Sequence, residues 1–358
     1  GKCPTFSGGS PAAKQRRRCG SPVGKPVPGR GTAVAASVPA LFPENLPIPD
    51  VFPARGAVFG KKVLLVDIDP QGNSSSIFSE IDYFKLLTGQ AEQKKSVQDI
   101  LLDTELDPHE AISKTKYAKL DVIPAYLSLA ETEETIKADK IVPQQFKLTN
   151  QLDKIDEEYD YCIIDCSPSL SILNINALVA ADEVYIPMGV DAGSLMGARS
   201  VKNVVRMVRS YRPRLHITGA FFTRYQENKE VSKQAINIFK AIMGDITLIP
   251  ISVRNNRMVE ETSWVQEPLC ELDEKRKGTA TIDYLFLTRY MMEIDKSEIS
   301  KKYTEYIQAE KEMNRIKTLK SKKNSGKIND DQLIELKELK KKYDGKKLED
   351  YIDFVEVV

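Results

Sequence analysis

The fold of this chain is decided by the stretch GKKVLLVDIDPQGN, which occupies residues 60–73. Within it, Val63–Val66 is a short and wholly apolar run of the kind that a strand buried on both faces requires. The run ends in Asp67 and Asp69, and alternation along an extended segment directs these two carboxylates to the same side. A proline and a glycine then turn the chain into a loop. The stretch therefore predicts a buried strand that carries two acids to its carboxyl end.

Apolar runs and segments with helical spacing alternate along the chain after this strand. Such alternation implies a parallel sheet with helices on both faces. We therefore predict an α/β fold with a doubly wound, mostly parallel sheet, whose ligands bind at the carboxyl ends of the strands. The predicted strands are Leu120–Ile123, Tyr161–Ile164, Glu183–Met188, Leu215–Phe222 and Ile246–Ile251, and the predicted helices are Pro143–Ile155, Ile172–Ala181, Ala192–Tyr211 and Val231–Ile242.

A third acid ends another of these strands. The stretch YCIIDCSP at residues 161–168 is an apolar strand that delivers Asp165 to its tip before a turn. A buried carboxylate is unfavourable unless it is paired or bound to a metal, so Asp165 needs a partner. In phosphoryl-transfer enzymes that partner is Mg²⁺ on the phosphates, while a second polar group orients the attacking water. Each acid taken alone is equally consistent with a cap on the next helix or turn.

The composition is that of a soluble globular protein, with 358 residues of which 41% are hydrophobic and 29% are charged. No run of about 18 uninterrupted apolar residues is present, so we expect no transmembrane helix. Two histidines cannot build a multi-histidine zinc site. Five scattered cysteines fit reduced thiols better than a disulfide framework, so we expect a cytoplasmic protein.

Three segments of the chain differ in charge. Residues 1–60 hold eight basic and two acidic side chains, residues 61–294 hold 28 and 35, and residues 295–358 hold 16 and 14. We expect residues 1–59, which are rich in proline, glycine and arginine, to be disordered or unrelated to the domain that residues 60–294 form. An acidic domain cannot bind nucleic acid by bulk charge, so binding would need a local patch or a tail.

The last segment, residues 295–358, predicts a charged helical tail. Apolar residues recur there at helical intervals before and after a break at residues 324–326, which indicates a helical hairpin with Asp330 or Asp331 capping its second helix. The acidic end of the chain, residues 348–358, would be repelled by anionic lipid. We therefore expect no membrane partner and no MinD-like membrane cycle.

Several of these motifs resemble those of the ParA/Soj-type partition ATPases, which belong to the MinD/ParA superfamily of deviant P-loop ATPases. Residues 60–73 are similar to the switch I region of that family, and residues 161–170 are similar to its Walker B strand and switch II. The likeness covers residues 60 to about 294 in the expected order. It continues through Val122–Ala125, Asn174–Val184 and Ile249–Arg254.

This resemblance implies an ATPase of chromosome or plasmid partitioning that forms a homodimer around ATP and Mg²⁺. It implies nonspecific DNA binding on the nucleoid and hydrolysis triggered by a ParB-like partner protein. By position, Asp69 would be the switch I aspartate that acts on the attacking water, and Asp165 would be the Walker B aspartate that serves Mg²⁺ through water. The other residues that the resemblance places at the nucleotide are Asp67, which would support the switch I loop, Gln71, Pro168, and Pro250, which would lie near the adenine.

The chain departs from this family ahead of residue 60, where the family has a first strand, a phosphate loop of the form K-G-G-x-G-K-[ST] and a helix. Residues 1–59 offer only GSPVGKP, at residues 20–26. Backbone N–H groups, a lysine and a Ser/Thr hydroxyl bind the nucleotide in such a loop, and Pro22 and Pro26 remove donors there. We therefore expect the sheet to lack its first strand. Two hypotheses stay open: an ATP hydrolase of ParA type, and a non-hydrolysing scaffold or interaction protein.

One predicted helix carries a basic stripe. The stripe consists of Arg199, Lys202, Arg206 and Arg209, at spacings of three and four on one face of Ala192–Tyr211. Such a stripe on an acidic domain is suited to contact with DNA phosphates, and the alternative is a solvated helix face.

Overall fold

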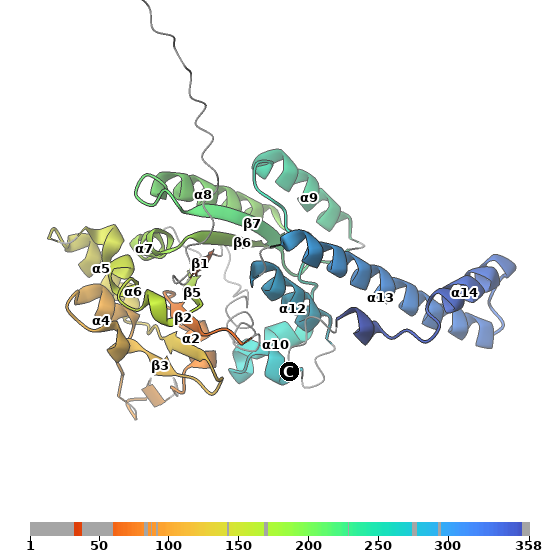
Figure 1. The fold of residues 1–358 in the computed structure, drawn as a ribbon, viewed down its shortest axis with the longest axis horizontal. Coiled ribbons are helices and arrows are strands. Elements are labelled where there is room, and N and C mark those ends of the chain that lie inside the picture. Colours follow the sequence, from red (N-terminus) through yellow and green to blue (C-terminus); the bar gives the residue numbers. More distant parts are fainter. Residues whose placement is uncertain are drawn as a thin grey trace, which may run out of the picture.

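The computed structural model describes residues 32–37, 60–81, 85–86, 88–90, 92–141, 143–167, 171–227, 229–273, 278–292 and 295–352. These residues form a central sheet, helices around it and a long helical hairpin that projects from the body (Figure 1). The strands are β1 (Thr32–Ser37), β2 (Val63–Asp67), β3 (Ser113–Lys114), β4 (Leu120–Ile123), β5 (Tyr161–Cys166), β6 (Glu183–Met188) and β7 (His216–Phe222).

The helices in the described part of the chain are as follows. The α-helices are α2 (Asn73–Phe78), α4 (Val97–Leu102), α5 (Leu129–Ala138), α6 (Lys147–Leu152), α7 (Ile172–Ala180), α8 (Ala192–Val208), α9 (Glu230–Met243), α10 (Arg257–Val265), α11 (Leu269–Leu272), α12 (Thr279–Met292), α13 (Lys296–Asn324) and α14 (Asp330–Lys342). Short 3₁₀ turns are η1 (Pro108–Ala111), η2 (Gln144–Phe146), η3 (Asp156–Glu158) and η4 (Leu348–Tyr351). None of the described helices is both long and apolar enough to span a membrane.

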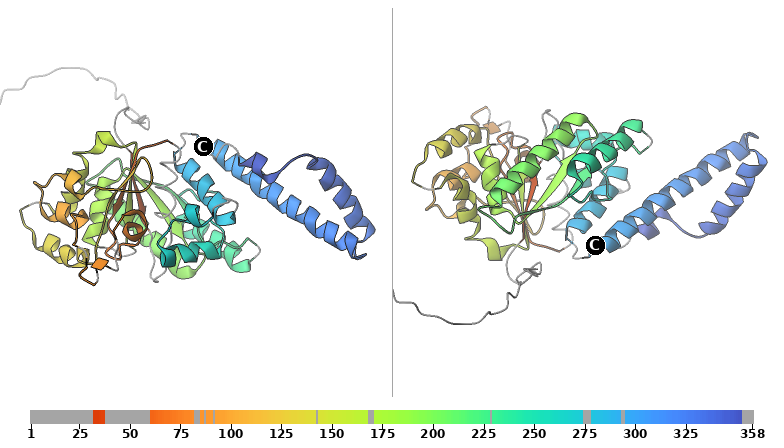
Figure 2. Two further views of the ribbon diagram at one scale, coloured as in Figure 1. Left: turned by 90° about the horizontal axis from the view of Figure 1, so that it is seen from below. Right: turned by 90° about the horizontal axis from the view of Figure 1, so that it is seen from above.

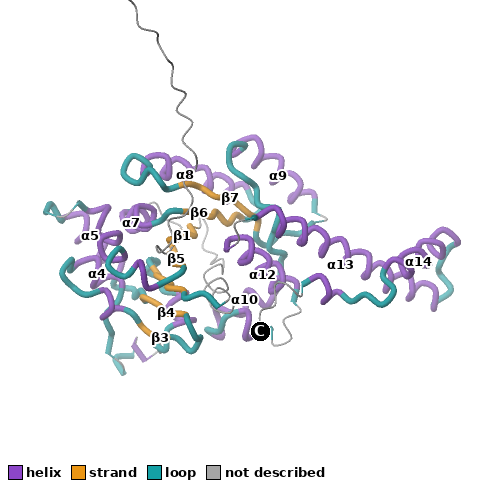
Figure 3. Tube along the Cα trace, viewed as in Figure 1, coloured by secondary structure: helices purple, strands orange, loops and turns teal. Residues whose placement is uncertain are grey.

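The sheet has the strand order β3-β4-β2-β5-β1-β6-β7. Every neighbouring pair is parallel except β3 with β4, and Figure 3 shows the strands enclosed by helices. The prediction of a doubly wound, mostly parallel sheet is therefore confirmed. The predicted strand at Ile246–Ile251 is wrong, because this segment makes only an isolated bridge from Leu248 to Ala220. The regular ladder stops after Ile249, because the carbonyl of Phe222 accepts from the N–H of Val253 and not from that of Ile251, where a continued parallel ladder would place the donor.

The expectation that the sheet lacks its first strand is also wrong. Thr32–Ser37 forms β1 between β5 and β6, with Ala36 opposite Asp165 and Ala35 opposite Val184. Its sequence, TAVAAS, is short and rich in alanine, so it carries little strand propensity of its own. The pairing comes from the tertiary structure, because backbone groups on both sides of β1 find partners in strands that are already parallel.

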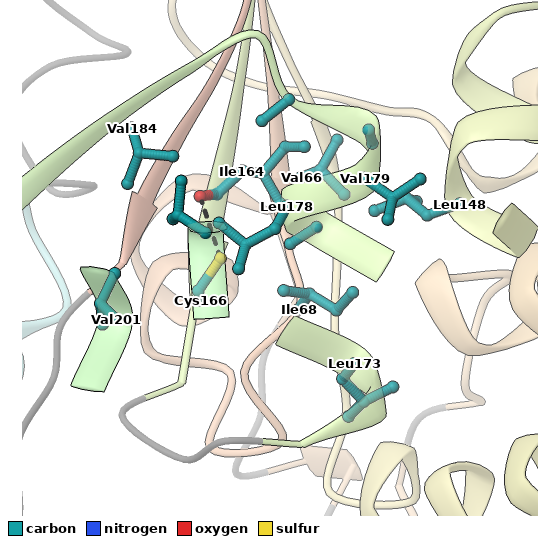
Figure 4. Close-up of a cluster of buried hydrophobic side chains, with 14 of the residues drawn as sticks. Val66, Ile68, Leu148, Ile164, Cys166, Leu173, Leu178, Val179, Val184 and Val201 are labelled. Atoms are coloured by element: carbon teal, nitrogen blue, oxygen red, sulfur yellow. Dashed lines mark hydrogen bonds between the residues drawn. The ribbon is translucent and has the colours of Figure 1, made fainter. Parts of the chain in front are cut away.

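The core lies on both faces of the sheet because successive residues of the central strands point in opposite directions. Leu64 and Val66 of β2 pack in one cluster with helices α4 to α9, whereas Val63 and Leu65 pack in the other with α12 and the first turns of α13. Figure 4 shows part of the first cluster, where β-strand side chains meet those of α6, α7 and α8. The wholly apolar run of β2 is thus required by burial on both faces.

The tail forms the predicted helical hairpin, which both views in Figure 2 show extending away from the sheet. The first turns of α13 belong to the core of the body through Ile299, Tyr303 and Tyr306. Farther out, α13 packs on α14 and the segment that follows it. The predicted cap of α14 is wrong, because Asn329 accepts the bond from Gln332 N and Asp330 and Asp331 lie in the first turn.

A buried ion pair fixes the hairpin to the body. The guanidinium of Arg254 donates two bonds of 2.9 Å to the fully buried carboxylate of Asp283 and also bonds Glu310 of α13. Tyr303 of α13 donates to Asp283 at 3.0 Å and to the carbonyl of Ser252 at 3.1 Å. The segment between α9 and α10 therefore meets α12 and α13 at one charged junction.

Arg254→Ala should lower the free energy of unfolding by about 3–5 kcal/mol, because it leaves the Asp283 carboxylate buried without its cation. The matched control is Arg257→Ala, whose side chain is 88% exposed and pairs with Glu261 one turn away. That control should change stability by less than about 0.5 kcal/mol. Urea denaturation of both variants measures the difference, and equal values would contradict the structural role given to Arg254.

Candidate functional site

The acidic ends of β2 and β5 lie side by side at one edge of the sheet. Asp67 and Asp165 are direct partners in the parallel register, and the backbone N–H of Ile68 donates to the carbonyl of Asp165 at 2.9 Å. Asp69 follows two residues after Asp67 in the same loop. The structure thus brings together the three acids that the sequence singled out, from strands about a hundred residues apart.

Two serines of α2 hold these carboxylates. Ser75 donates to Oδ2 of Asp67 from its backbone N–H at 2.9 Å and from its hydroxyl at 2.6 Å, and its hydroxyl also accepts from the N–H of Ala125 at 2.8 Å. Ser74 donates its hydroxyl to Oδ2 of Asp165 at 2.7 Å. Sequence reasoning missed both serines, and the available signal was their place in the first turn of a helix that begins directly after the acidic loop.

The loop between β2 and α2 has a defined shape. The N–H of Asp69 donates to Oδ1 of Asp67 at 3.0 Å, and the N–H of Gln71 donates to Oδ1 of Asp69 at 3.0 Å. Gly72 closes the turn at φ 64° and ψ 30°, in the left-handed region that L side chains rarely adopt. The carboxylate of Asp69 is therefore held at the edge by the backbone of its own turn.

Burial makes negative charge unfavourable at this edge. It raises the pKa of Asp67 to about 6, against the opposing effect of the donors from Ser75 and Asp69. It also raises the pKa of Asp69 above its ordinary value of 3.8. The thiol of Cys166, the residue after Asp165, has a pKa raised well above 9 by burial and by the three nearby carboxylates. A bound cation would be stabilised here, and Cys166 is not a nucleophile.

The oxygen atoms at this edge fit a hard cation such as Mg²⁺. Among the described residues, no three His, Cys, Asp or Glu side chains form a complete metal cage. Magnesium in phosphoryl-transfer sites takes only one or two protein carboxylates and completes its shell with water and phosphate. The carboxylate of Asp165, with the hydroxyl of Ser74 beside it, supplies that kind of donor set.

The sequence after β1 does not fit a phosphate-binding loop. The strand β1 ends at Ser37, opposite Cys166, and so at the same edge of the sheet as Asp165. A phosphate loop at this place needs glycines, a lysine and a Ser/Thr hydroxyl. Residues 38–54 contain five prolines and no Gly, Lys, Ser or Thr. Residues 20–26, the candidate from the sequence, precede β1 in the chain, whereas a phosphate loop would follow it.

The structure separates the remaining predicted nucleotide residues. The side chain of Gln71 is exposed, and its backbone N–H contributes to the Asp69 turn. Pro250 is exposed at the carboxyl end of β7, which is three strands and about 14 Å from β5. Pro168 lies outside the described residues. Pro250 and the acids therefore share an edge of the sheet without being in contact.

The basic stripe of α8 is only partly available. Arg199, Arg206 and Arg209 are exposed, whereas Lys202 is half-buried and pairs with Asp245 after α9. The hydrogen bond from Lys202 lowers the pKa of the Asp245 carboxyl, and the positive charge of Arg206 lowers it further. Three of the four predicted cations thus face solvent.

Comparison with known proteins identifies the family. A family model described as AAA domain matches residues 55–217. The sporulation initiation inhibitor protein Soj of Bacillus subtilis is 35% identical over 223 residues, which are 62% of this chain and 83% of that protein. The chain belongs to the ParA/Soj family. The chromosome partitioning protein ParA of Caulobacter vibrioides is 32% identical over 248 residues, which are 68% of this chain and 88% of ParA.

Solved structures support the fold of this ParA/Soj family member. Cobyrinic acid a,c-diamide synthase from Mycobacterium smegmatis superimposes with a TM-score of 0.58 at 24% identity, over 74% of this chain and 97% of that one. The apo form of McdA from Cyanothece superimposes with a TM-score of 0.57 at 18% identity, over 71% of this chain and 99% of that one. At these identities the likeness concerns the fold alone.

Asp67→Asn should lower the free energy of unfolding by about 1–3 kcal/mol, because an amide cannot accept bonds at both of the positions that Asp69 and Ser75 occupy. The control Asp153→Asn changes an exposed acid on the same domain and should have little effect. Chemical denaturation followed by circular dichroism gives both values. Equal stability of the Asp67 variant and wild type would show that these bonds do not hold the loop.

Proposed function

We propose that this chain serves chromosome or plasmid partitioning as a ParA-like protein whose site for magnesium and the phosphates of ATP is the edge that holds Asp67, Asp69 and Asp165. The observation that carries the proposal is the register that sets Asp67 opposite Asp165, with both carboxylates fixed by serines of α2. Acids at the carboxyl ends of neighbouring parallel strands occupy the place where α/β sheets bind ligands.

The three acids of the edge and Ser74 would have different roles in hydrolysis. Asp165 would hold Mg²⁺ through water, and Ser74 would orient that carboxylate. Asp69, half-buried and with a raised pKa, would accept a hydrogen bond from the attacking water and orient it in line with the terminal phosphate. When bound, magnesium would neutralise charge on the phosphates. Asp67 would act indirectly, because its bonds to Ser75 and Asp69 shape the loop.

Relatives support the partners in this proposal. The M. smegmatis diamide synthase has been crystallised with an ATP analogue and magnesium, and the B. subtilis and C. vibrioides relatives are named for sporulation control and chromosome partitioning. By that relationship this chain would form a homodimer, bind DNA without sequence preference, respond to a ParB-like partner and act on the nucleoid in the cytoplasm. The exposed cations of α8 would contact the DNA phosphates.

A second candidate function is a non-hydrolysing scaffold of the same family. The observation that favours it is the proline-rich segment at residues 38–54, which follows β1 where a phosphate loop would stand. Such a protein would keep the sheet, the acidic edge and the interaction surfaces, and it would not hold the triphosphate. The two candidates therefore differ in whether they bind and hydrolyse the nucleotide, and they have the sheet, the acidic edge and the interaction surfaces in common.

Nucleotide binding decides between the two candidates. For the hydrolase, isothermal titration should give micromolar affinity for ATP with Mg²⁺, and phosphate release should fall by about 100-fold or more in Asp69→Ala. The control Asp153→Ala should keep the wild-type rate, and circular dichroism should be unchanged in both variants. Absence of ATP binding by the folded wild-type protein would support the scaffold and contradict hydrolysis.

The role of α8 is tested by salt dependence. Replacing Arg199, Arg206 and Arg209 together with glutamine should reduce the slope of log K against log salt for duplex DNA by about 2–3 in the presence of Mg²⁺ and ATP. Lys202→Gln should change this slope less than the triple replacement does, because Lys202 already pairs with Asp245. A matched control replaces the exposed Lys94, Lys116 and Lys140 of the body. An unchanged slope in the α8 variant would show that this helix does not contact the DNA.

A further inference from the structure

The outer end of the hairpin carries a dense run of positive charge. Residues 313–329, which we name the basic tip, hold six basic side chains and no acidic one. These are Arg315, Lys317, Lys320, Lys322, Lys323 and Lys327. Residues 313–347 together hold twelve basic and five acidic side chains, while residues 61–294 of the body hold 28 and 35. This outer part of the hairpin therefore has a net positive charge, whereas the body has a net negative charge.

Most of the charge at the basic tip is not neutralised. Arg315 forms two bonds of 2.8 Å with Glu335 of α14, and Lys322 lies close enough to lower the pKa of that acid further. Lys317, Lys320, Lys323 and Lys327 are exposed and make no ion pair with the described residues. Four cations are therefore free to attract an anion.

The hairpin is packed, so the basic tip is held in place. Ile316 and Leu319 of α13 are buried against Leu336 of α14, and Lys342 bonds Glu312 at 2.6 Å. At the other end, Tyr306 is buried in the body, and α13 continues for about 27 Å from there to its end. Figures 1 and 2 show this arm directed away from the sheet.

This separation matters because the body is acidic. The screening length is about 10 Å at 0.1 M salt, so the body would repel a polyanion at the basic tip only weakly.

A membrane fits the basic tip less well than a polyanion does. Ile334 is the one large apolar side chain of the described hairpin that is prominently exposed, so the hairpin has no apolar face to insert into a bilayer. Lys317, Lys320 and Lys323 recur at spacings of three on α13, and Lys327 follows its end, so these lysines can contact a run of backbone phosphates.

We propose that the basic tip binds the phosphate backbone of a nucleic-acid duplex, without reading sequence and without nucleotide. This binding goes beyond the proposed function, because it uses neither the acidic edge nor α8. It is present in a single copy of the chain, since the lysines belong to one hairpin.

The test uses the full-length protein without ATP and a fluorescent 30-base-pair DNA duplex of arbitrary sequence, with binding followed by anisotropy over a range of salt. The tip variant replaces Lys317, Lys320, Lys323 and Lys327 with glutamine, which removes charge and retains helix propensity. The matched body variant replaces Lys94, Lys116, Lys140 and Lys240, which are also exposed, and circular dichroism checks both folds.

At about 0.1 M salt the tip variant should bind at least tenfold more weakly than wild type, and its slope of log K against log salt should fall by about 3, while the body variant stays near wild type. A second duplex of unrelated sequence should bind equally. Unchanged binding by the tip variant overturns the proposal, and so does equal loss in the tip and body variants. Sedimentation with anionic phospholipid vesicles but no duplex binding would overturn it in favour of a lipid surface. Failure of ATP binding would leave all of these outcomes unaffected.

Discussion

The constraint on which this structure depends is that a carboxylate buried at the end of an apolar strand must be satisfied. Asp67 has no exposed surface, and the donors from Asp69 and Ser75 make its burial tolerable. Through these bonds the strand β2, the turn after it, helix α2 and the loop after β4 become one unit. The acid that is least accessible therefore sets the position of the two that could act on a ligand.

The edge of the sheet combines two unlike halves. One half, made by β2, β5 and α2, carries fixed oxygen ligands of the kind that magnesium and phosphate chemistry uses. The other half begins where β1 ends and continues into a segment without the residue types that bind phosphate through backbone N–H groups. Membership of the ParA/Soj family follows from the relatives that the chain matches, and it does not by itself make up for the residue types that the second half lacks.

The sequence predicted those parts of the fold that depend on a local pattern of apolar residues. The apolar runs of β2, β4, β5 and β6 gave the parallel sheet, because strands buried on both faces must be apolar throughout. It could not give β1, whose alanine-rich segment becomes a strand through pairing on both sides. Ser74 was missed because its carboxylate partner lies 91 positions away. Ile246–Ile251 looked like a strand by hydrophobicity, but its pairing with β7 slips after Ile249, so that Val253 and not Ile251 bonds the carbonyl of Phe222.

The place of β1 also bears on how the molecule is made. Its neighbours β5 and β6 begin about 120 residues or more after it in the chain. At synthesis rates of about 5–20 residues per second, the emerging segment waits on the order of ten seconds before either partner leaves the ribosome. During that time β2 can pair with β4, and the middle of the sheet stays open until the second half of the nascent chain arrives. The oldest of the described strands therefore completes its pairing only after two younger ones have left the ribosome.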